Sequence, residues 1–324
     1  MYIVNTKRTR FMKLSTLVFM TCLGLLVQAE ARNINVLILQ FFDSHDMRYQ
    51  AEIYEQVLNA TGDYDAEVMI IPEDQNWEDI DIRFADYQLI ISSYLGQEMP
   101  DRIKDEFDQY MSDGGNLVIV HQGVLSLEGW SKFHEMIGLG WYKAGAGQHI
   151  FWDNNDKKWI ETPPYHGVGP GHGKQHEFVI NVRHEDHTIT RDMPKEWIHG
   201  MDEFYHGLRG PAKNIEILAT SFSDKRTWGS GDHEPIAWTV KYGKGRIFVT
   251  VLGHAFLEEK ADVVEGVDHY ENETKAVHCV GFQTLFARGA EWAATGKVTT
   301  NIPKNFPKKA SSVVVPPNEV KWRN

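Results

Sequence analysis

Cysteine is nearly absent from this sequence, which rules out one common way of stabilising an exported protein. Only two of the 324 residues are cysteine, Cys22 and Cys279, and Cys22 falls in the predicted leader described below. A single remaining cysteine cannot form an intrachain disulfide, so stability must come from a hydrophobic core. Small disulfide-stapled domains are therefore excluded.

Basic charge is also scarce. The chain carries 33 Lys and Arg against 45 Asp and Glu, a formal net charge of −12. Nucleic acids and anionic membranes both require a cationic surface, so we expect neither as a partner. No Gly-x-x-x-x-Gly-Lys-Ser/Thr loop occurs, and Gly169-x-Gly171-x-Gly173 lacks a preceding strand and a following helix. We therefore expect no nucleotide cofactor.

Long apolar runs are lacking outside the first 31 residues. There, four basic residues precede an apolar stretch over 14–27, and Ala29-Glu30-Ala31 matches an Ala-x-Ala cleavage site. The stretch is too short to span a bilayer comfortably. We expect residues 1–31 to be a cleavable signal peptide and the mature chain to be periplasmic or extracellular, without membrane insertion. Cleavage leaves 29 basic and 44 acidic residues, a net charge of −15.

Apolar runs that alternate with helical patterns are present in the rest of the chain. Runs over 35–42, 67–71, 88–92 and 117–120 are typical of strands buried on both faces, as in parallel sheets. Helical spacing predicts a helix that ends at Gly62 and another that Pro100 opens. Later strands are predicted over 177–183, 215–220, 236–240 and 246–252, and a helix over 280–294. This order predicts an α/β fold with a doubly wound, mostly parallel sheet.

Residues 138–173 interrupt the pattern with a segment rich in Gly, Pro, aromatic residues and His. Its aromatic content argues against disorder, so we expect an ordered insertion over the ligand edge of the sheet. The loop with His166, His172 and His176 could bind a metal or form a flexible substrate lid. From residue 299 the composition turns to Lys, Pro and Ser. We therefore expect one domain over 32–298 and a loosely held tail over 299–324.

The most informative stretch is 114–124, where an apolar strand runs directly into His121. Ligands of open α/β sheets bind beyond the carboxyl ends of such strands. We expect a tight turn there, relieved by Gly123. An imidazole at this position suits proton transfer or metal ligation better than acyl transfer, and no Gly-x-Ser-x-Gly elbow is present.

Two further histidines follow predicted strands, His45 and His254. We expect at least two of the three to share a site, although each could be a hydrogen-bonded core residue. Imidazole and carboxylate ligands suit zinc, and also manganese or iron in open sites, so a divalent metal is one interpretation. No His-Glu-x-x-His motif supports it.

Carboxylates and a phenol come together in the segment 202–206. Such groups can act as acid and base when their surroundings differ, so Glu203 is a candidate general acid or base. The candidate residues are His121, Glu203, His254 and Tyr205 for catalysis; His45, His121 and His254 for a metal; and His45, Asp43, Asp202, Trp141, Trp152, Tyr165, His172 and Arg209 for substrate contact.

Several segments resemble the trehalose-utilisation, or ThuA-like, family, whose fold is related to class I glutamine amidotransferases. They are 114–121, 187–194, 202–205, 237–246, 252–254, 281–283 and 288–294. The resemblance implies a flavodoxin-like sandwich in which the amidotransferase nucleophile is replaced, here by His121, so glutaminase activity is not implied. It also implies a role in sugar catabolism, often beside oxidoreductases that make 3-keto-glycosides, but it does not supply the reaction.

Three functions stay open at this point. The first is an exported enzyme that isomerises a glycoside or 3-keto-disaccharide, or eliminates a substituent from it, by acid–base chemistry with or without a metal. The second is a non-catalytic carbohydrate-binding protein that uses the aromatic insertion. The third is a glycoside hydrolase with a carboxylate pair such as Glu203 and Asp43. Each expects a small carbohydrate as partner, and a homo-oligomer stays open.

Overall fold

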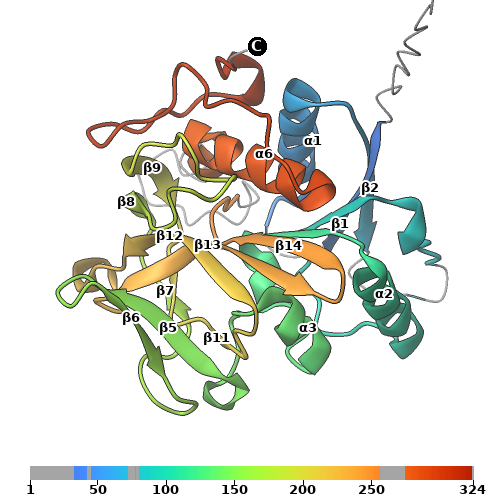
Figure 1. The fold of residues 1–324 in the computed structure, drawn as a ribbon, viewed down its shortest axis with the longest axis horizontal. Helices are drawn as coiled ribbons and strands as arrows, with labels where there is room; N and C mark the ends of the chain where they lie inside the picture. Colours follow the sequence, from blue (N-terminus) through green and yellow to red (C-terminus); the bar gives the residue numbers. More distant parts are fainter. Residues whose placement is uncertain (1–32, 42–44, 72–76, 78–79, 256–273, 323–324) are drawn as a thin grey trace, which may run out of the picture. The chain divides into compact units, whose positions relative to one another are not determined.

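A continuous sheet runs through the protein and carries helices on both faces (Figure 1). The structure is a computed structural model that describes residues 33–41, 45–71, 77, 80–255 and 274–322. The main strands are β1 (Ile34–Phe41), β2 (Tyr64–Ile71), β3 (Leu89–Ser92), β4 (Leu117–Val120), β8 (His176–Val182), β9 (Glu196–Asp202), β12 (Ile215–Phe222), β13 (His233–Tyr242) and β14 (Gly245–Thr250). Their order is β2-β1-β3-β4-β14-β13-β12-β8-β9.

The helices enclose the sheet from both sides, as a doubly wound fold requires. Helices α1 (Met47–Thr61) and α6 (Val280–Thr295) lie on one face, and α2 (Asp101–Asp113) and α3 (Ser131–Ile137) on the other (Figure 1). A short α5 (Lys275–His278) precedes α6. As predicted, α1 ends at Gly62, and Pro100 directly precedes α2.

The sheet is parallel in one half and antiparallel in the other. Strands β2, β1, β3, β4 and β14 are parallel neighbours, and β3 and β4 are buried on both faces. From β14 outward to β9, every main-path pairing is antiparallel. The two-residue turn between β13 and β14 explains why these two strands are antiparallel, because a parallel crossover needs a dozen or more residues. The predicted α/β fold is confirmed.

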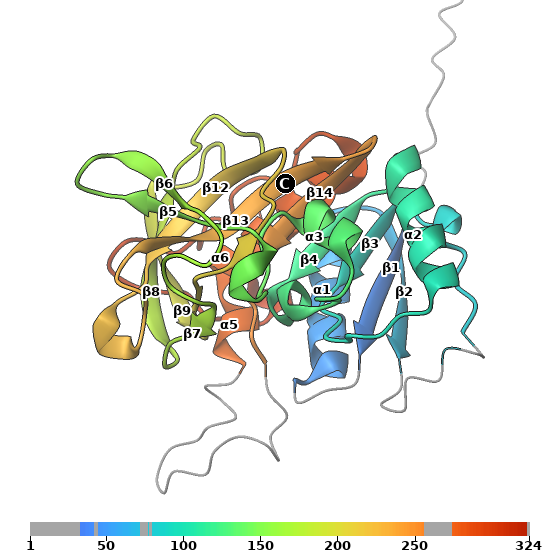
Figure 2. The same cartoon turned by 90° about the horizontal axis from the view of Figure 1, so that it is seen from below.

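The insertion is ordered and contains strands that the sequence patterns did not reveal. Strands β5 (Gln148–Asp153) and β6 (Lys158–Thr162) form a hairpin, and β5 also pairs with β11 (Arg209–Gly210) and β13. Strand β7 (Gly171–His172) pairs with β10 (Tyr205–His206). These strands lie at the end of the sheet away from β2 (Figure 2). The insertion therefore fastens to the sheet next to the strand ends that carry the candidate site.

The predicted loosely held tail is wrong. Phe306 and Val320 are buried, and backbone hydrogen bonds join Val280 to Val313 and Ile198 to Lys308. Residues 33–324 form one compact unit, so the tail belongs to the same body as the sheet. The apolar residues spaced among its lysines and prolines provide the burial that composition alone concealed.

The predicted signal peptide and Asp43 lie outside the described residues. Within the described ranges, none of the helices combines the length and apolar character needed to cross a membrane.

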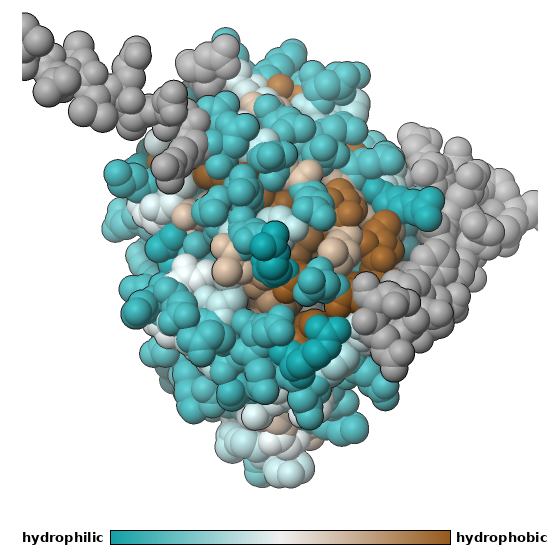
Figure 3. All heavy atoms as spheres, turned by 90° about the vertical axis from the view of Figure 1, so that its right-hand side faces the viewer, coloured by the Kyte–Doolittle hydropathy of each residue, from teal (hydrophilic) through white to brown (hydrophobic). Residues whose placement is uncertain are grey.

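The outer strand β2 borders a face where apolar residues gather among hydrophilic ones (Figure 3), and Val68 on this strand is 41% exposed. A homo-oligomer stays a prediction.

Candidate functional site

His121 occupies a strained turn at the carboxyl end of β4. Its φ is +44°, in the left-handed region that residues other than Gly seldom adopt. A Cβ added to Gly123 would lie 2.8 Å from the carbonyl oxygen of Ser92, so only glycine fits that position without a shift. The tight turn relieved by Gly123 is therefore confirmed, and it aims the imidazole beyond the strand end.

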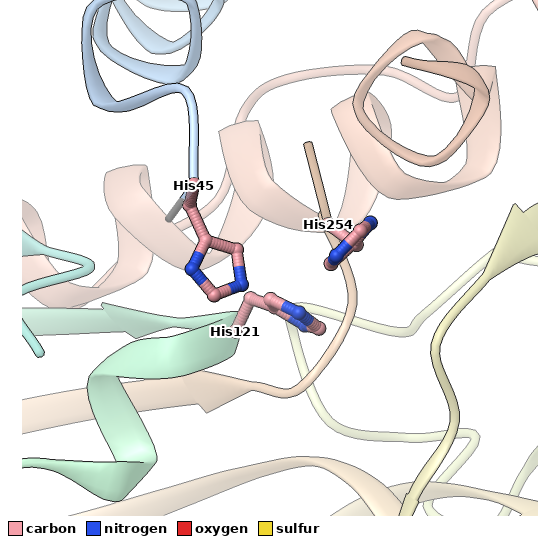
Figure 4. A group of neighbouring side chains, drawn as sticks. All are labelled: His45, His121 and His254. Atoms are coloured by element: carbon pink, nitrogen blue, oxygen red, sulfur yellow. The ribbon is translucent and has the colours of Figure 1, made fainter. Parts of the chain in front are cut away.

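The three histidines that follow strands converge on one point (Figure 4). One ring nitrogen from each of His45, His121 and His254 lies within 4.8 Å of the others, and all three side chains are buried. The backbone N–H of Asp46 donates to the carbonyl of Ala255 at 2.8 Å, which ties the turns of His45 and His254 together. The expected juxtaposition is confirmed.

Hydrogen bonds define the state of the His121 ring. Nδ1 lies 2.8 Å from the carbonyl oxygen of Val251, which can only accept, so Nδ1 carries the proton. Nε2 is then the acceptor for the Tyr205 hydroxyl at 2.9 Å. Burial, followed by the nearby His254 and His45, holds the pKa of His121 well below its ordinary value. A neutral imidazole with a basic Nε2 can act as a base or a ligand.

The Glu203 carboxylate lies beside the histidines. Its oxygens are 3.6 Å from Nε2 of His254, 3.9 Å from Nε2 of His121 and 3.8 Å from Nδ1 of His172. The carboxylate is 13% exposed, whereas the side chain of His172 is 49% exposed. These separations are too long for direct hydrogen bonds and are suited to a bridging water or ion.

The donor set suits a divalent metal in its chemistry. Imidazoles from His45, His121 and His254 and a carboxylate from Glu203 are ligands that zinc, manganese and iron accept. The Val251 carbonyl that fixes the His121 tautomer is the kind of outer contact that metal-binding histidines commonly make. The same residues could equally hold and transfer a proton.

Aromatic side chains extend from this cluster toward the insertion. The rings of Tyr205 and His121 stack at 4.4 Å, and Trp141 meets Tyr205 edge-on at 5.3 Å. His172 lies 6.0 Å from Trp141. The structure therefore brings Trp141 and His172, two of the predicted substrate contacts, to the cluster.

Other predicted contacts lie elsewhere or are already occupied. Trp152 packs on Trp159 at 5.2 Å and under the guanidinium of Arg183. Tyr165 is 78% exposed and packs close to Gly145. The guanidinium of Arg209 is buried and donates to the carbonyls of His166 and Val168. Arg209 thus fixes the insertion loop through Nη2, whereas its Nε and Nη1 have no hydrogen-bond partner among the described residues, and its contact with substrate stays a prediction.

Asp202 is also committed to the protein itself. Its buried carboxylate accepts N–H groups from Gly253, His254 and His199, which leaves it poorly placed to bind substrate as predicted. Sequence reasoning missed the glutamines around the site. Gln175 Nε2 lies 3.4 Å from Nδ1 of His254. For Gln50, which is fully buried in α1, the available signal was a polar residue on the apolar face of the predicted helix; Gln175, in a half-buried bend, gave no such signal.

A hollow of about 740 Å³ is distant from this chemistry. It is lined by Gln88, Gly114 and Asn116, at the ends where β3 and β4 begin. The histidine cluster lies at the opposite ends of these strands. The hollow and the cluster of titratable groups therefore indicate two different places for a site. Converging titratable groups indicate function more strongly than volume does, so the histidine cluster is the candidate site.

Comparison with known proteins agrees with this fold. The ThuA family model, described as trehalose utilisation, matches residues 35–261. The chain belongs to the ThuA family. A ThuA-like protein from Parabacteroides merdae is 34% identical, with 88% of this chain and 99% of that chain covered and a TM-score of 0.75. One from Bacteroides uniformis shares the fold at 17% identity, with 87% and 98% covered and a TM-score of 0.50. None of the curated proteins matches.

Proposed function

We propose that this ThuA-family protein is an exported enzyme of carbohydrate catabolism that acts on a glycoside or 3-keto-disaccharide. The observation that carries the proposal is the convergence of His45, His121 and His254 with Glu203 at one edge of the sheet. The family description, trehalose utilisation, supports a sugar as substrate. The predicted signal peptide supports a periplasmic or extracellular location.

The proposed reaction begins with removal of an acidified proton. In a 3-keto sugar, a C–H bond next to the carbonyl breaks, its proton passes to the Glu203 carboxylate, and its electron pair moves toward the carbonyl oxygen to form an enediolate. For isomerisation, the hydroxyl proton of the deprotonated carbon moves to the former carbonyl oxygen, and the abstracted proton returns from Glu203 to the former carbonyl carbon, so that the carbonyl is now on the neighbouring carbon. Loss of the glycosidic oxygen, which takes up a proton as its C–O bond breaks, gives elimination.

The other residues of the cluster orient and polarise the sugar. Neutral His121 and the Tyr205 hydroxyl form a proton-transferring pair beside Glu203, and Trp141 offers a ring face for stacking. A divalent ion held by His45, His254 and Nε2 of His121, which would then give up its hydrogen bond to Tyr205, would supply Lewis-acid stabilisation of the developing oxyanion. The half-exposed His172 lies at the outer side of Glu203, where it can contact a sugar hydroxyl.

Turnover assays and metal analysis together test the proposal. Purified mature protein is incubated with 3-keto-glycosides and with their unoxidised parents, and its metal content is measured by mass spectrometry. We expect consumption of the keto sugars and stoichiometric metal. Glu203→Gln should abolish turnover, whereas Glu216→Gln, at a surface carboxylate paired with His184, should not.

The alternatives give different results in the same assays. Sugar binding without turnover, unchanged in His121→Ala, would favour the carbohydrate-binding protein. Hydrolysis of the unoxidised glycoside would favour the hydrolase. Neither outcome is compatible with the proposed reaction.

A further inference from the structure

A second buried polar network lies behind the histidine cluster. Asp202 is the last residue of β9, and its side chain is fully buried. One carboxylate oxygen accepts Nε2–H of His199 at 2.8 Å and the backbone N–H of Gly253 at 2.9 Å. The other accepts the backbone N–H of His254 at 3.3 Å. The Asp202 carboxylate therefore holds the backbone of Gly253 and His254 in place, and His254 is a candidate metal ligand.

The same peptide unit is also held at its other end. The carbonyl oxygen of Gly253 accepts Nε2–H of Gln50 at 3.0 Å, and the Gln50 amide pairs with that of Gln122. The Gly253–His254 peptide is thus fixed through both its C=O and its N–H. Gly253 itself has a φ of +106°, and an added Cβ would lie 2.8 Å from the ring of Phe282. Few other backbone orientations are open to this turn, so the direction of the His254 side chain is set by it.

His199 connects Asp202 to the cysteine. Cys279 directly precedes α6, and its sulfur accepts the N–H of Gly200 at 3.3 Å. Burial would lower the pKa of His199, but Cys279 and Asp202 together raise it to about 10. Burial would raise the pKa of Cys279, but His199 and the N–H groups of Gly200 and Phe282 lower it. Because a carboxylate can only accept, Nε2 of His199 carries a proton, and this hydrogen bond holds the Asp202 carboxylate in place.

This Cys-His-Asp arrangement cannot be a nucleophilic triad on its own. The sulfur, the imidazole and the carboxylate are all buried, at 0%, 0% and 1% exposure of their residues, and a substrate cannot reach them. The arrangement instead resembles the support that orients metal-binding side chains in other proteins.

We infer that Asp202, supported by His199 and Cys279, is a positioning residue that fixes His254 in the orientation in which it meets His45 and His121. The inference rests on the proposed function, because it assigns the network to the same site. This role differs from a purely structural one. Loss of the Asp202 hydrogen bonds to Gly253 and His254 should change what the three histidines bind while the fold persists.

Cobalt(II) binding to the metal-free protein tests this inference independently of turnover. The cobalt visible spectrum reports the geometry of its ligands. Asp202→Asn keeps the shape of the side chain but replaces one acceptor oxygen by an NH₂ group, which can only donate. At least one of the N–H groups of Gly253, His254 and His199 then loses its acceptor. We expect about 10- to 100-fold weaker cobalt binding and an altered spectrum. His199→Gln should weaken binding in the same direction.

Glu234→Gln is the matched control. Glu234 is a buried carboxylate that also bonds a histidine, with 2.9 Å between its oxygen and Nε2 of His149. We expect a similar loss of stability from this substitution but cobalt binding like that of the wild type. Equal weakening by Glu234→Gln and Asp202→Asn would overturn the inference, as would wild-type cobalt binding by Asp202→Asn.

NMR signals of His254 provide a second test of the inference, one that does not depend on metal binding. If the wild type binds no cobalt, the metal-assisted part of the proposed function fails. The ring nitrogen and proton NMR signals of His254, assigned by their loss in His254→Ala, then test the positioning. They should move in Asp202→Asn and stay in place in Glu234→Gln. Unmoved His254 signals in Asp202→Asn would refute the inference that Asp202 positions His254.

Discussion

The hydroxyl of Tyr205 lies 2.9 Å from Nε2 of His121, and their rings stack at 4.4 Å. Because Nδ1 of the same ring faces the carbonyl of Val251, the phenol is the donor and the imidazole the acceptor. The pair joins residues separated by 84 positions in the chain. Tyr205 is therefore the hydroxyl best placed to exchange a proton with the strained histidine.

Tyr205→Phe should remove this proton path while leaving the ring stack. General acid–base groups contribute about 10²- to 10⁴-fold to rate, so we expect turnover to fall by at least about 100-fold. The loss of one hydrogen bond should cost only about 1 kcal/mol of unfolding free energy. Tyr54→Phe, which removes a buried hydroxyl bonded to Ser93 at 3.0 Å, is the control and should retain turnover. Equal rates in the two variants would exclude Tyr205 from the chemistry.

The sequence predicted the histidine cluster because it depends on topology alone. Carboxyl ends of neighbouring parallel strands share one edge, so His45, His121 and His254 could be brought together from strand boundaries. The partners of these residues were beyond such reasoning. Asp202 reaches the site from the antiparallel half of the main sheet, where pairing order does not follow chain order, and Tyr205 reaches it from the separate two-stranded sheet of β7 and β10.

The packing of the tail and the strand pairing of the insertion also could not be predicted from the sequence. The segment over 299–322 is rich in Lys and Pro, and its packing depends on a few apolar residues without periodicity. The β5–β6 hairpin has alternate residues of similar exposure, so the period-two signal that identifies a half-buried strand is weak. Composition identified the insertion as ordered, and only coordinates could show to which strands it pairs.

Acid should destabilise the protein through His121. Its folded-state pKa is lowered by burial, so the unfolded state binds this proton more readily. The stability that neutral His121 provides is fully present above the unfolded pKa of about 6.5 and is lost as pH falls below that value. Chemical denaturation at a series of pH values should show a smaller decline below about pH 6.5 in His121→Gln than in the wild type. Parallel declines in the two proteins would contradict this assignment.

Gly123→Ala should be strongly destabilising, because its Cβ would meet backbone and not a movable side chain. An overpacked position of this kind typically costs about 1 to 3 kcal/mol, which thermal or chemical unfolding can measure. Gly129→Ala provides the comparison, since a Cβ at that position meets nothing within 4 Å. If both alanines are tolerated equally, the turn before the site is looser than its contacts indicate.

The tail should contribute to stability through Phe306. This ring is 8% exposed and meets Trp197 edge-on at 5.4 Å. Phe306→Ala should lower the free energy of unfolding by about 3 to 5 kcal/mol, the usual cost of removing a buried aromatic ring. Phe222→Ala removes the same ring from a position that is 46% exposed and should cost much less. A small effect of Phe306→Ala would show that the tail contributes little to the core.

Substrate contact should discriminate between two tryptophans of the insertion. Trp141 lies against Tyr205 and near His172, whereas Trp152 packs on Trp159 and Arg183. If sugars stack at the cluster, Trp141→Ala should weaken binding, measured by calorimetry or as a rise in KM, by about 5- to 13-fold, the equivalent of an aromatic contact worth about 1 to 1.5 kcal/mol. Trp152→Ala should leave sugar affinity unchanged. The reverse ranking would move the sugar to the β5–β6 hairpin and away from the histidines, and the catalytic proposal would then lose its substrate.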